Sequence, residues 1–150
     1  MTQANDGAIE KEARIAARPE TVFSFLVEPA KMTRWMGTTA ELDPRPGGIF
    51  RVNVTGKDMA SGQYREVIPN SKVVFTWGWE EEGGQVPPGS TTIEITLASD
   101  GDGTILRMRH SGLAVERRDS HADGWDHYLS RLELAAAGSD PGPDPWVQAG

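Results

Sequence analysis

The chain has 150 residues, a formal net charge of −7 and no cysteine. This length is enough for one domain with a buried core and too short for two ordinary domains. The absence of cysteine excludes disulfides, thiolate catalysis and thiolate metal sites. The 15 Lys and Arg residues form no long basic cluster, so we do not expect the phosphate-binding surface of a nucleic-acid-binding protein.

The sequence also argues against a membrane protein or a secreted one. No apolar run approaches the roughly 20 residues that a membrane-spanning helix needs. Residues 1–7 contain no basic segment followed by an apolar core, as a secretory signal would. We therefore expect a cytoplasmic protein with no membrane partner.

The chain divides into three parts. Residues 1–8 are expected to be a flexible N-terminus, and residues 9–137 carry the periodic patterns of a folded domain. Residues 138–150 contain three prolines and no strand pattern, which is typical of a flexible tail. Trp146 is the one tryptophan of that tail, and we keep open that it packs on its own domain or on a neighbouring subunit.

The first third of the chain predicts a strand and two short helices. Residues 9–16 form the strand pattern. Pro19 suits the first turn of a helix, because its φ is fixed and its missing N–H is not needed there. Pro29 ends that helix and starts a second one, which runs from Ala30 to Trp35.

After residue 49 the apolar period changes from helical to two, which is typical of strands. Asp100 to Gly103 form a strong hairpin turn signal, because Gly and Asp tolerate positive φ. Short turns between strands predict an antiparallel meander. The expected strands are 50–54, 62–68, 72–79, 91–97 and 104–110.

A long amphipathic helix is predicted from about Ser120 to Ala137. Trp125 lies at the centre of its apolar face, and we expect it to be buried against the sheet. The same face carries His121, Ala122, Tyr128, Leu129, Leu132 and Ala136, whereas the predicted solvent face carries Asp126, His127 and Arg131.

Six segments in a fixed order carry a family resemblance: 17–23 (ARPETVF), 35–37 (WMG), 43–48 (DPRPGG), 75–77 (FTW), 110–113 (HSGL) and 124–129 (GWDHYL). On these segments the chain resembles the helix-grip fold of the START-like superfamily, also called Bet v 1-like or SRPBCC. Within it, the chain is similar to the group named after the C-terminal domain of the activator of Hsp90 ATPase.

The resemblance implies an α+β fold. A curved antiparallel sheet wraps around a long C-terminal helix, two short helices follow the first strand, and a cavity lies between sheet and helix. It implies no single function, because this fold hosts lipid carriers, hormone receptors, cyclases and chaperone-linked domains. The eukaryotic Hsp90 activator has a separate N-terminal domain that contacts the chaperone. This chain has no room for one, so we do not take the family name as evidence of co-chaperone activity.

Large side chains at the expected sheet–helix interface are the candidates for a ligand cavity. Phe75 and Trp77 share one strand face, although the sequence does not say which face is concave. Met108 and His110 alternate with Arg109, which predicts that His110 points inward. The candidate ligand-binding residues are Trp35, Phe50, Val52, Tyr64, Phe75, Trp77, Met108, His110, Trp125 and Leu129.

The inward His110 has two interpretations. It forms a structural hydrogen bond to a backbone carbonyl, or it serves as a polar anchor or proton donor in the cavity. His121 is placed to close one end of the cavity. We expect no metal or cofactor, because His121 and His127 fall on different helix faces and the glycine pairs lack the context of a phosphate loop.

Three functions stay open. The leading one is a carrier or sensor that binds a small apolar or aromatic molecule without catalysis. The second is a cyclase or dehydratase acting on a polyketide-like substrate, which requires Tyr64, Glu66 and His110 to converge. The third is an interaction module for a chaperone or a related regulator. Separately, we keep open that the protein forms a homodimer. A shut cavity beside an exposed apolar patch would favour that third function.

Overall fold

A computed structural model of the chain describes residues 8–81, 84 and 86–147. The sheet has seven strands, all antiparallel, in the order β1-β7-β6-β5-β4-β3-β2. Strands β2 to β7 form a meander, and β1 closes the other edge by pairing with β7. The strands are β1 (Ile9–Ile15), β2 (Thr39–Leu42), β3 (Ile49–Asn53), β4 (Met59–Ile68), β5 (Lys72–Trp77), β6 (Thr91–Asp100) and β7 (Gly103–Ser111).

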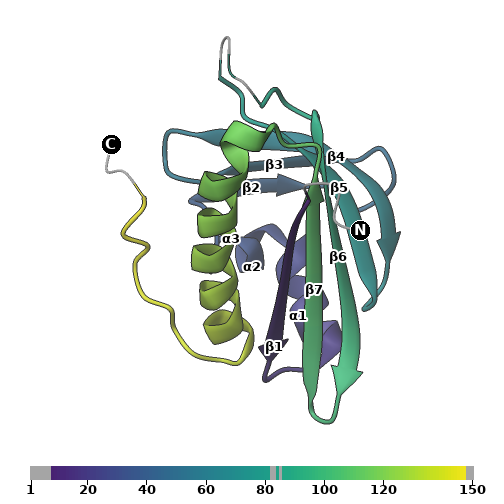
Figure 1. The fold of residues 1–150 in the computed structure, drawn as a ribbon. Coiled ribbons are helices and arrows are strands. Elements are labelled where there is room, and N and C mark those ends of the chain that lie inside the picture. Colours follow the sequence, from purple (N-terminus) through teal and green to yellow (C-terminus); the bar gives the residue numbers. More distant parts are fainter. Residues whose placement is uncertain (1–7, 82–83, 85, 148–150) are drawn as a thin grey trace.

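Three helices lie on the inner side of this curved sheet (Figure 1). Two short ones, α1 (Pro19–Val27) and α2 (Pro29–Met32), follow β1, and each begins at the proline that the sequence predicted. The long helix α3 (Val115–Ala136) follows β7 and packs against β1 and α1. The predicted helix-grip fold is confirmed.

The strand β4 bends the sheet at its middle. Its first half pairs with β3, its second half pairs with β5, and the register shifts between Tyr64 and Glu66. Gly62 lies where the two halves meet. A Cβ atom there would be 2.0 Å from the carbonyl oxygen of Thr76, so only glycine allows this close approach. The irregularity increases the local twist and lets the sheet curve around α3.

Some element boundaries differ from the sequence prediction. Helix α3 begins at Val115 instead of Ser120. The sequence prediction missed its first turns because they are polar and because the N-cap residue, Ala114, forms no side-chain cap that would mark the start. The strand β2 was not predicted, since it is a short edge strand without a buried face. Strand β5 ends at Trp77 and not at Trp79, because Gly78 packs directly against the backbone of Pro87.

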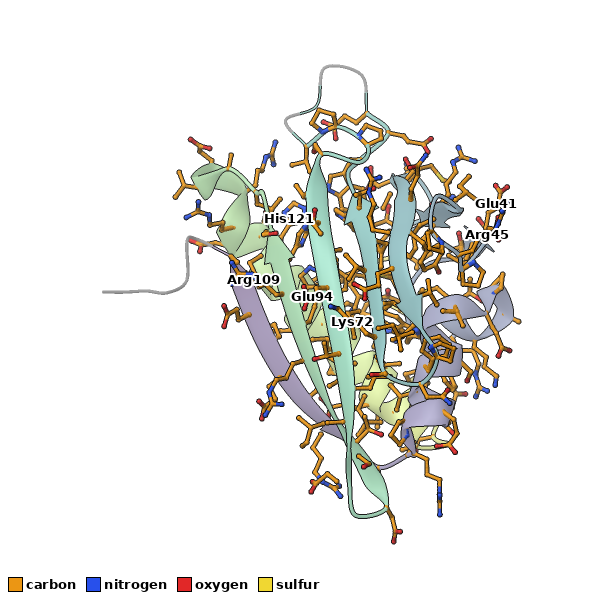
Figure 2. The ribbon with its side chains drawn as sticks, turned by 90° about the vertical axis from the view of Figure 1, so that its right-hand side faces the viewer. Glu41, Arg45, Lys72, Glu94, Arg109 and His121 are labelled. Carbon is orange, nitrogen blue, oxygen red and sulfur yellow. The ribbon has the colours of Figure 1, made fainter. Side chains whose placement is uncertain are left out.

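The outer face of the sheet carries charged side chains that pair across neighbouring strands. Arg109 contacts Glu10 at 2.7 Å, and Lys72 lies between Glu66 and Glu94 at 3.3 and 3.9 Å. Figure 2 looks onto this face and labels Lys72, Glu94 and Arg109. The parity argument is therefore correct: the arginines of β7 face outward, and Met108 and His110 face the core.

The core lies between the inner sheet face, α1 and α3. Phe50 stacks on Phe75 with ring centroids 4.1 Å apart, and Tyr64 meets both rings edge-on. The inner face of β5 therefore carries Phe75 and Trp77. From α3 the buried residues are Trp125, Tyr128, Leu129, Leu132, Ala135 and Ala136.

Candidate functional site

A pocket of about 290 Å³ opens between the first half of α3, the end of β5 and the loop that joins β3 to β4. Its volume is near the lower end of the roughly 300–1,000 Å³ range of small-molecule sites. The walls are formed by Met36, Val54, Thr55, Asp58, Trp77, Trp79, Arg117, Ser120, His121, Gly124, Trp125, Tyr128 and Trp146.

Aromatic rings from three parts of the chain meet at this pocket. Trp77 lies edge-on to Trp79, with centroids 5.3 Å apart, and tilted against Trp125 at 5.6 Å. Tyr128 adds a fourth ring from the next turn of α3, and Trp146 adds a fifth from the C-terminal segment. Such walls favour apolar and aromatic molecules, because ring contacts add to the free energy of area burial.

Two polar atoms of the pocket residues have no hydrogen-bond partner among the described residues. These are Nε1 of Trp77 and the hydroxyl of Tyr128, both buried. Burial, and secondarily the charges of Asp144 and Asp58, raise the pKa of Tyr128, so the hydroxyl keeps its proton at neutral pH. Both groups can donate a hydrogen bond, and neither has an acceptor among the described residues.

His121 lies at the pocket wall in the first half of α3 (Figure 2). Its Nδ1 contacts the carbonyl oxygen of Arg117 at 2.9 Å, and its Nε2 accepts a hydrogen bond from Nε1 of Trp79 at 3.1 Å. Because the indole can only donate, the neutral ring carries its proton on Nδ1. Burial lowers the pKa of His121, which favours this neutral form. His121 thus fixes the ring of Trp79.

His110 is fully buried beneath the pocket and does not line it. Its Nδ1 accepts from Nε1 of Trp125 at 3.0 Å, so its proton lies on Nε2 and is donated to Oγ1 of Thr91 at 2.8 Å. Thr91 in turn donates to the carbonyl oxygen of Trp77 at 2.7 Å. Burial, with a smaller contribution from His121, lowers the pKa of His110 to about 3.

This network leaves neither nitrogen of His110 free for a ligand. Of the two interpretations of His110, the geometry agrees with the structural one, with Thr91 standing between the imidazole and the backbone carbonyl. The network also joins α3 to β5, β6 and β7 at one point.

Of the ten predicted ligand-binding residues, Trp77 and Trp125 line the pocket. The other eight are buried in the core: Trp35, Phe50, Val52, Tyr64, Phe75, Met108, His110 and Leu129. Trp35 is an example, because its Nε1 donates to the carbonyl oxygen of Phe25 at 2.9 Å and ties the turn after α2 to α1.

The three residues that a cyclase or dehydratase would need do not converge. The hydroxyl of Tyr64 donates to the carbonyl oxygen of Leu26 at 3.2 Å. Glu66 lies on the outer side of the sheet, paired with Lys72. Both ring nitrogens of His110 are already hydrogen-bonded, one to Trp125 and the other to Thr91.

Sequence reasoning did not select several of the pocket residues as binding residues. Tyr128 and His121 were on the predicted apolar face of the helix, and that pattern was the available signal. Trp146 stands out in the sequence as the one tryptophan of the predicted tail, but no pattern gives its location. Nothing in the sequence marks Met36, Val54, Thr55 or Asp58 as pocket residues, because their place in the wall depends on tertiary packing.

Within the described ranges, no group of three or more His, Asp or Glu side chains is arranged to hold a metal ion. None of the described helices is long and apolar enough to span a bilayer.

A family model described as Activator of Hsp90 ATPase homolog 1-like protein matches residues 16–137. An AHSA1-like protein from Rhizobium etli, solved by solution NMR, is 48% identical, with 95% of this chain and 89% of that chain covered and a TM-score of 0.73. The search of curated proteins gives no match.

Two more distant structures repeat the fold. DynU16, a protein of the dynemicin biosynthetic locus, is 19% identical over 91% of this chain and 49% of its own, with a TM-score of 0.77. The Aha1 dimer from Colwellia psychrerythraea is 19% identical over 87% of this chain and 96% of its own, with a TM-score of 0.75. Since the family model covers most of the sequence, the chain belongs to the Activator of Hsp90 ATPase homolog 1-like family of the SRPBCC superfamily.

Proposed function

We propose that this protein binds a small apolar or aromatic molecule in the pocket between α3, the end of β5 and the β3–β4 loop. The observation that carries the proposal is the composition of the pocket wall. It combines aromatic rings with two buried donors, Nε1 of Trp77 and the hydroxyl of Tyr128, that have no partner among the described residues.

An unmatched buried polar group costs about 1–3 kcal/mol. A ligand that places an acceptor oxygen near Trp77 or Tyr128 would remove part of this cost. The apolar part of the same ligand would lie against the rings. The proposed ligand is therefore apolar or aromatic over most of its surface and carries one hydrogen-bond acceptor.

The competing functions have less support. The three residues considered for catalysis, Tyr64, Glu66 and His110, do not converge at the pocket, so we propose binding without catalysis. The large apolar residues that are exposed in the described ranges lie on separate elements or at opposite ends of α3, and they form no single docking patch: Ile49, Ile68, Val115, Leu134 and Trp146. DynU16 and the Aha1 dimer support the fold alone at their low identities. The cytoplasmic location, a homodimer and contact with a chaperone stay predictions.

Two probes of nearly equal shape test the proposal: 2-acetylnaphthalene, which carries a carbonyl acceptor, and 2-ethylnaphthalene, which does not. We expect the wild-type protein to bind both, and the ketone more tightly. Tyr128→Phe should weaken the ketone by about two- to tenfold, since a net hydrogen bond contributes about 0.5–1.5 kcal/mol. The hydrocarbon should bind the variant as it binds the wild type.

Tyr64→Phe is the matched control, because it removes a buried hydroxyl that points away from the pocket, to the carbonyl oxygen of Leu26. It should lower stability and leave the affinity for both probes unchanged. Tryptophan fluorescence quenching measures the dissociation constants of both probes for the wild type and the two variants. If neither probe binds the wild type at its solubility limit, the proposed function is wrong.

A further inference from the structure

The C-terminal segment folds back along α3, where the sequence predicted a flexible tail (Figure 1). Gly138 has a positive φ of 91° and reverses the chain after α3. Arg131 then holds the segment, because its guanidinium donates to the carbonyl oxygens of Pro141 at 3.4 Å and Gly142 at 3.0 Å. A third bond from Arg131 to the carbonyl oxygen of Trp35 fixes the guanidinium itself. The flexibility of this segment in solution stays a prediction.

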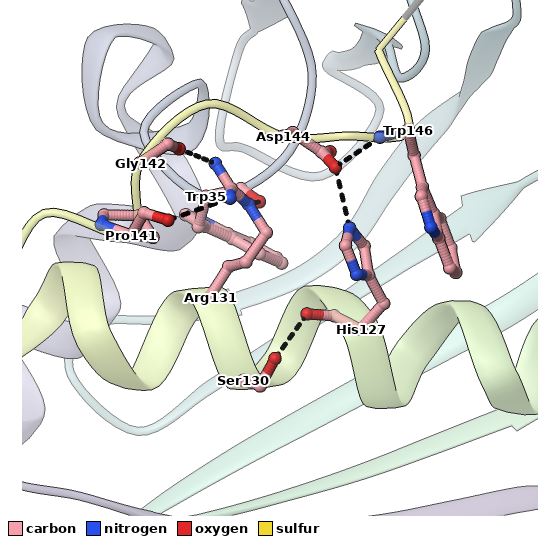
Figure 3. A network of polar contacts seen from close by, with 8 residues as sticks. All are labelled: Trp35, His127, Ser130, Arg131, Pro141, Gly142, Asp144 and Trp146. Carbon is pink, nitrogen blue, oxygen red and sulfur yellow. Dashed lines mark hydrogen bonds and ion pairs between the residues drawn. The ribbon is translucent and has the colours of Figure 1, made fainter.

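Asp144 connects the segment to α3 one turn further on (Figure 3). Its Oδ1 accepts from Nε2 of His127 at 2.8 Å and from the backbone N–H of Trp146 at 2.9 Å. The Asp144 side chain is only 6% exposed. The predicted solvent-facing position of His127 is therefore wrong, because the C-terminal segment covers this side of the helix.

The same contact sets the position of the Trp146 ring. That ring stacks on His127 with centroids 3.8 Å apart and an interplanar angle of 13°. It also meets Tyr128 edge-on at 5.7 Å. No further ring contact of Trp146 is found among the described residues, and 44% of the residue is exposed.

Trp146 is also part of the pocket wall. Of the other four rings at the pocket, Trp77, Trp125 and Tyr128 are each less than 7% exposed, and Trp79 is partly buried. Trp146 is therefore the most exposed of the five rings. It lies beyond residues 16–137, the part of the chain that the family model matches.

We propose that Trp146 is a ligand-contacting, specificity-determining residue of the pocket, which selects planar ring systems over saturated ones by stacking. The inference rests on the proposed function, because it requires the pocket to bind a ligand. Asp144 is a positioning residue, which acts through His127 and the backbone N–H of Trp146 and does not itself touch the ligand.

The test uses 2-naphthol and its saturated analogue decahydro-2-naphthol, which share one carbon skeleton and one hydroxyl. We expect the wild type to prefer the planar compound by about three- to tenfold, as an aromatic pair contributes beyond area burial. Trp146→Leu should lose this preference, Trp146→Phe should keep part of it, and Asp144→Ala should reduce it. Leu134→Ala, which alters another exposed apolar residue, is the control and should keep the full preference.

Isothermal titration gives the ratio of the two dissociation constants for the wild type and for each of the four variants. A two-dimensional NMR spectrum gives a second measurement on the wild type, in which the indole N–H signal that is missing in Trp146→Phe should shift on addition of 2-naphthol. An unchanged preference in Trp146→Leu, or an unmoved Trp146 signal, overturns this inference alone. Failure of the wild type to bind either compound overturns both it and the proposed function.

Discussion

His110 is a neutral structural residue and has no spare nitrogen for chemistry. Its two ring nitrogens have opposite roles: Nδ1 accepts from Trp125, and Nε2 donates to Thr91. A protonated imidazole would carry hydrogen on both nitrogens, and the indole N–H of Trp125 would then face another donor. Protonation is therefore incompatible with this network, in agreement with a pKa of about 3.

This geometry predicts that acid destabilises the protein. The pKa of His110 is about 3 in the folded protein and about 6.5 in an unfolded chain. Between these values the unfolded state binds more protons, so the contribution of His110 is complete above about pH 6.5 and falls as the pH decreases. The loss should approach about 1.4 kcal/mol per pH unit. Urea unfolding at pH 7.5, 6 and 5 measures it.

His110→Gln separates this contribution from the other titrating groups, His121 included. The glutamine amide can accept from Trp125 through its oxygen and donate to Thr91 through its nitrogen, and it does not titrate. The variant should be less stable than the wild type at pH 7.5 and should lose stability less steeply on acidification. Equal slopes for the two proteins would show that His110 does not titrate as described.

Among the elements, helix α3 has a different structural role in each half. Its C-terminal half supplies core residues such as Leu129 and Leu132, and its N-terminal half forms one wall of the pocket. Gly124 lies in this wall. A Cβ atom at Gly124 would meet nothing within 4 Å, so the glycine is required neither by crowding nor by a positive φ.

Two substitutions at Gly124 should therefore have different effects. Gly124→Ala should stabilise the protein by about 0.5–1 kcal/mol, because glycine is unfavourable inside a helix. It should leave the binding of 2-acetylnaphthalene nearly unchanged. Gly124→Phe should place a ring in the pocket and weaken binding by more than about tenfold, or 1.4 kcal/mol. Thermal unfolding and probe titration of both variants provide the comparison, and equal affinities would place the binding site elsewhere.

For the whole molecule, the sequence predicted the fold because its signals are local. Pro19 and Pro29 mark the two helix starts, and Gly101 takes the positive φ of 62° that the β6–β7 hairpin needs. The apolar face around Trp125 identified α3, and alternation identified the inward face of β7. Elements without such a signal were missed or shortened, as with β2 and the polar first turns of α3.

The candidate site was less predictable, because its walls come from segments that are distant in sequence. Trp77 and Trp125 were selected from strand and helix patterns, and they line the pocket. Those patterns identify an inward face, but they do not tell a packed position such as Phe50 from a position beside a cavity. The contribution of Trp146 depends on Gly138 and Arg131 directing the chain back along α3, and no periodic pattern records that path.

The folded domain does not depend on its C-terminal segment for its core. All residues of the hydrophobic core lie between Ile9 and Ala136, so a chain that ends at Gly138 should still fold. It should lose about 1.5–3 kcal/mol, since the bonds of Arg131 to Pro141 and Gly142 and the His127–Asp144 contact disappear, and hydrogen bonds to charged groups contribute this much. Circular dichroism should show an unchanged spectrum and a lower unfolding midpoint. An aggregated or unfolded product would show instead that the segment is needed to cover α3 during folding.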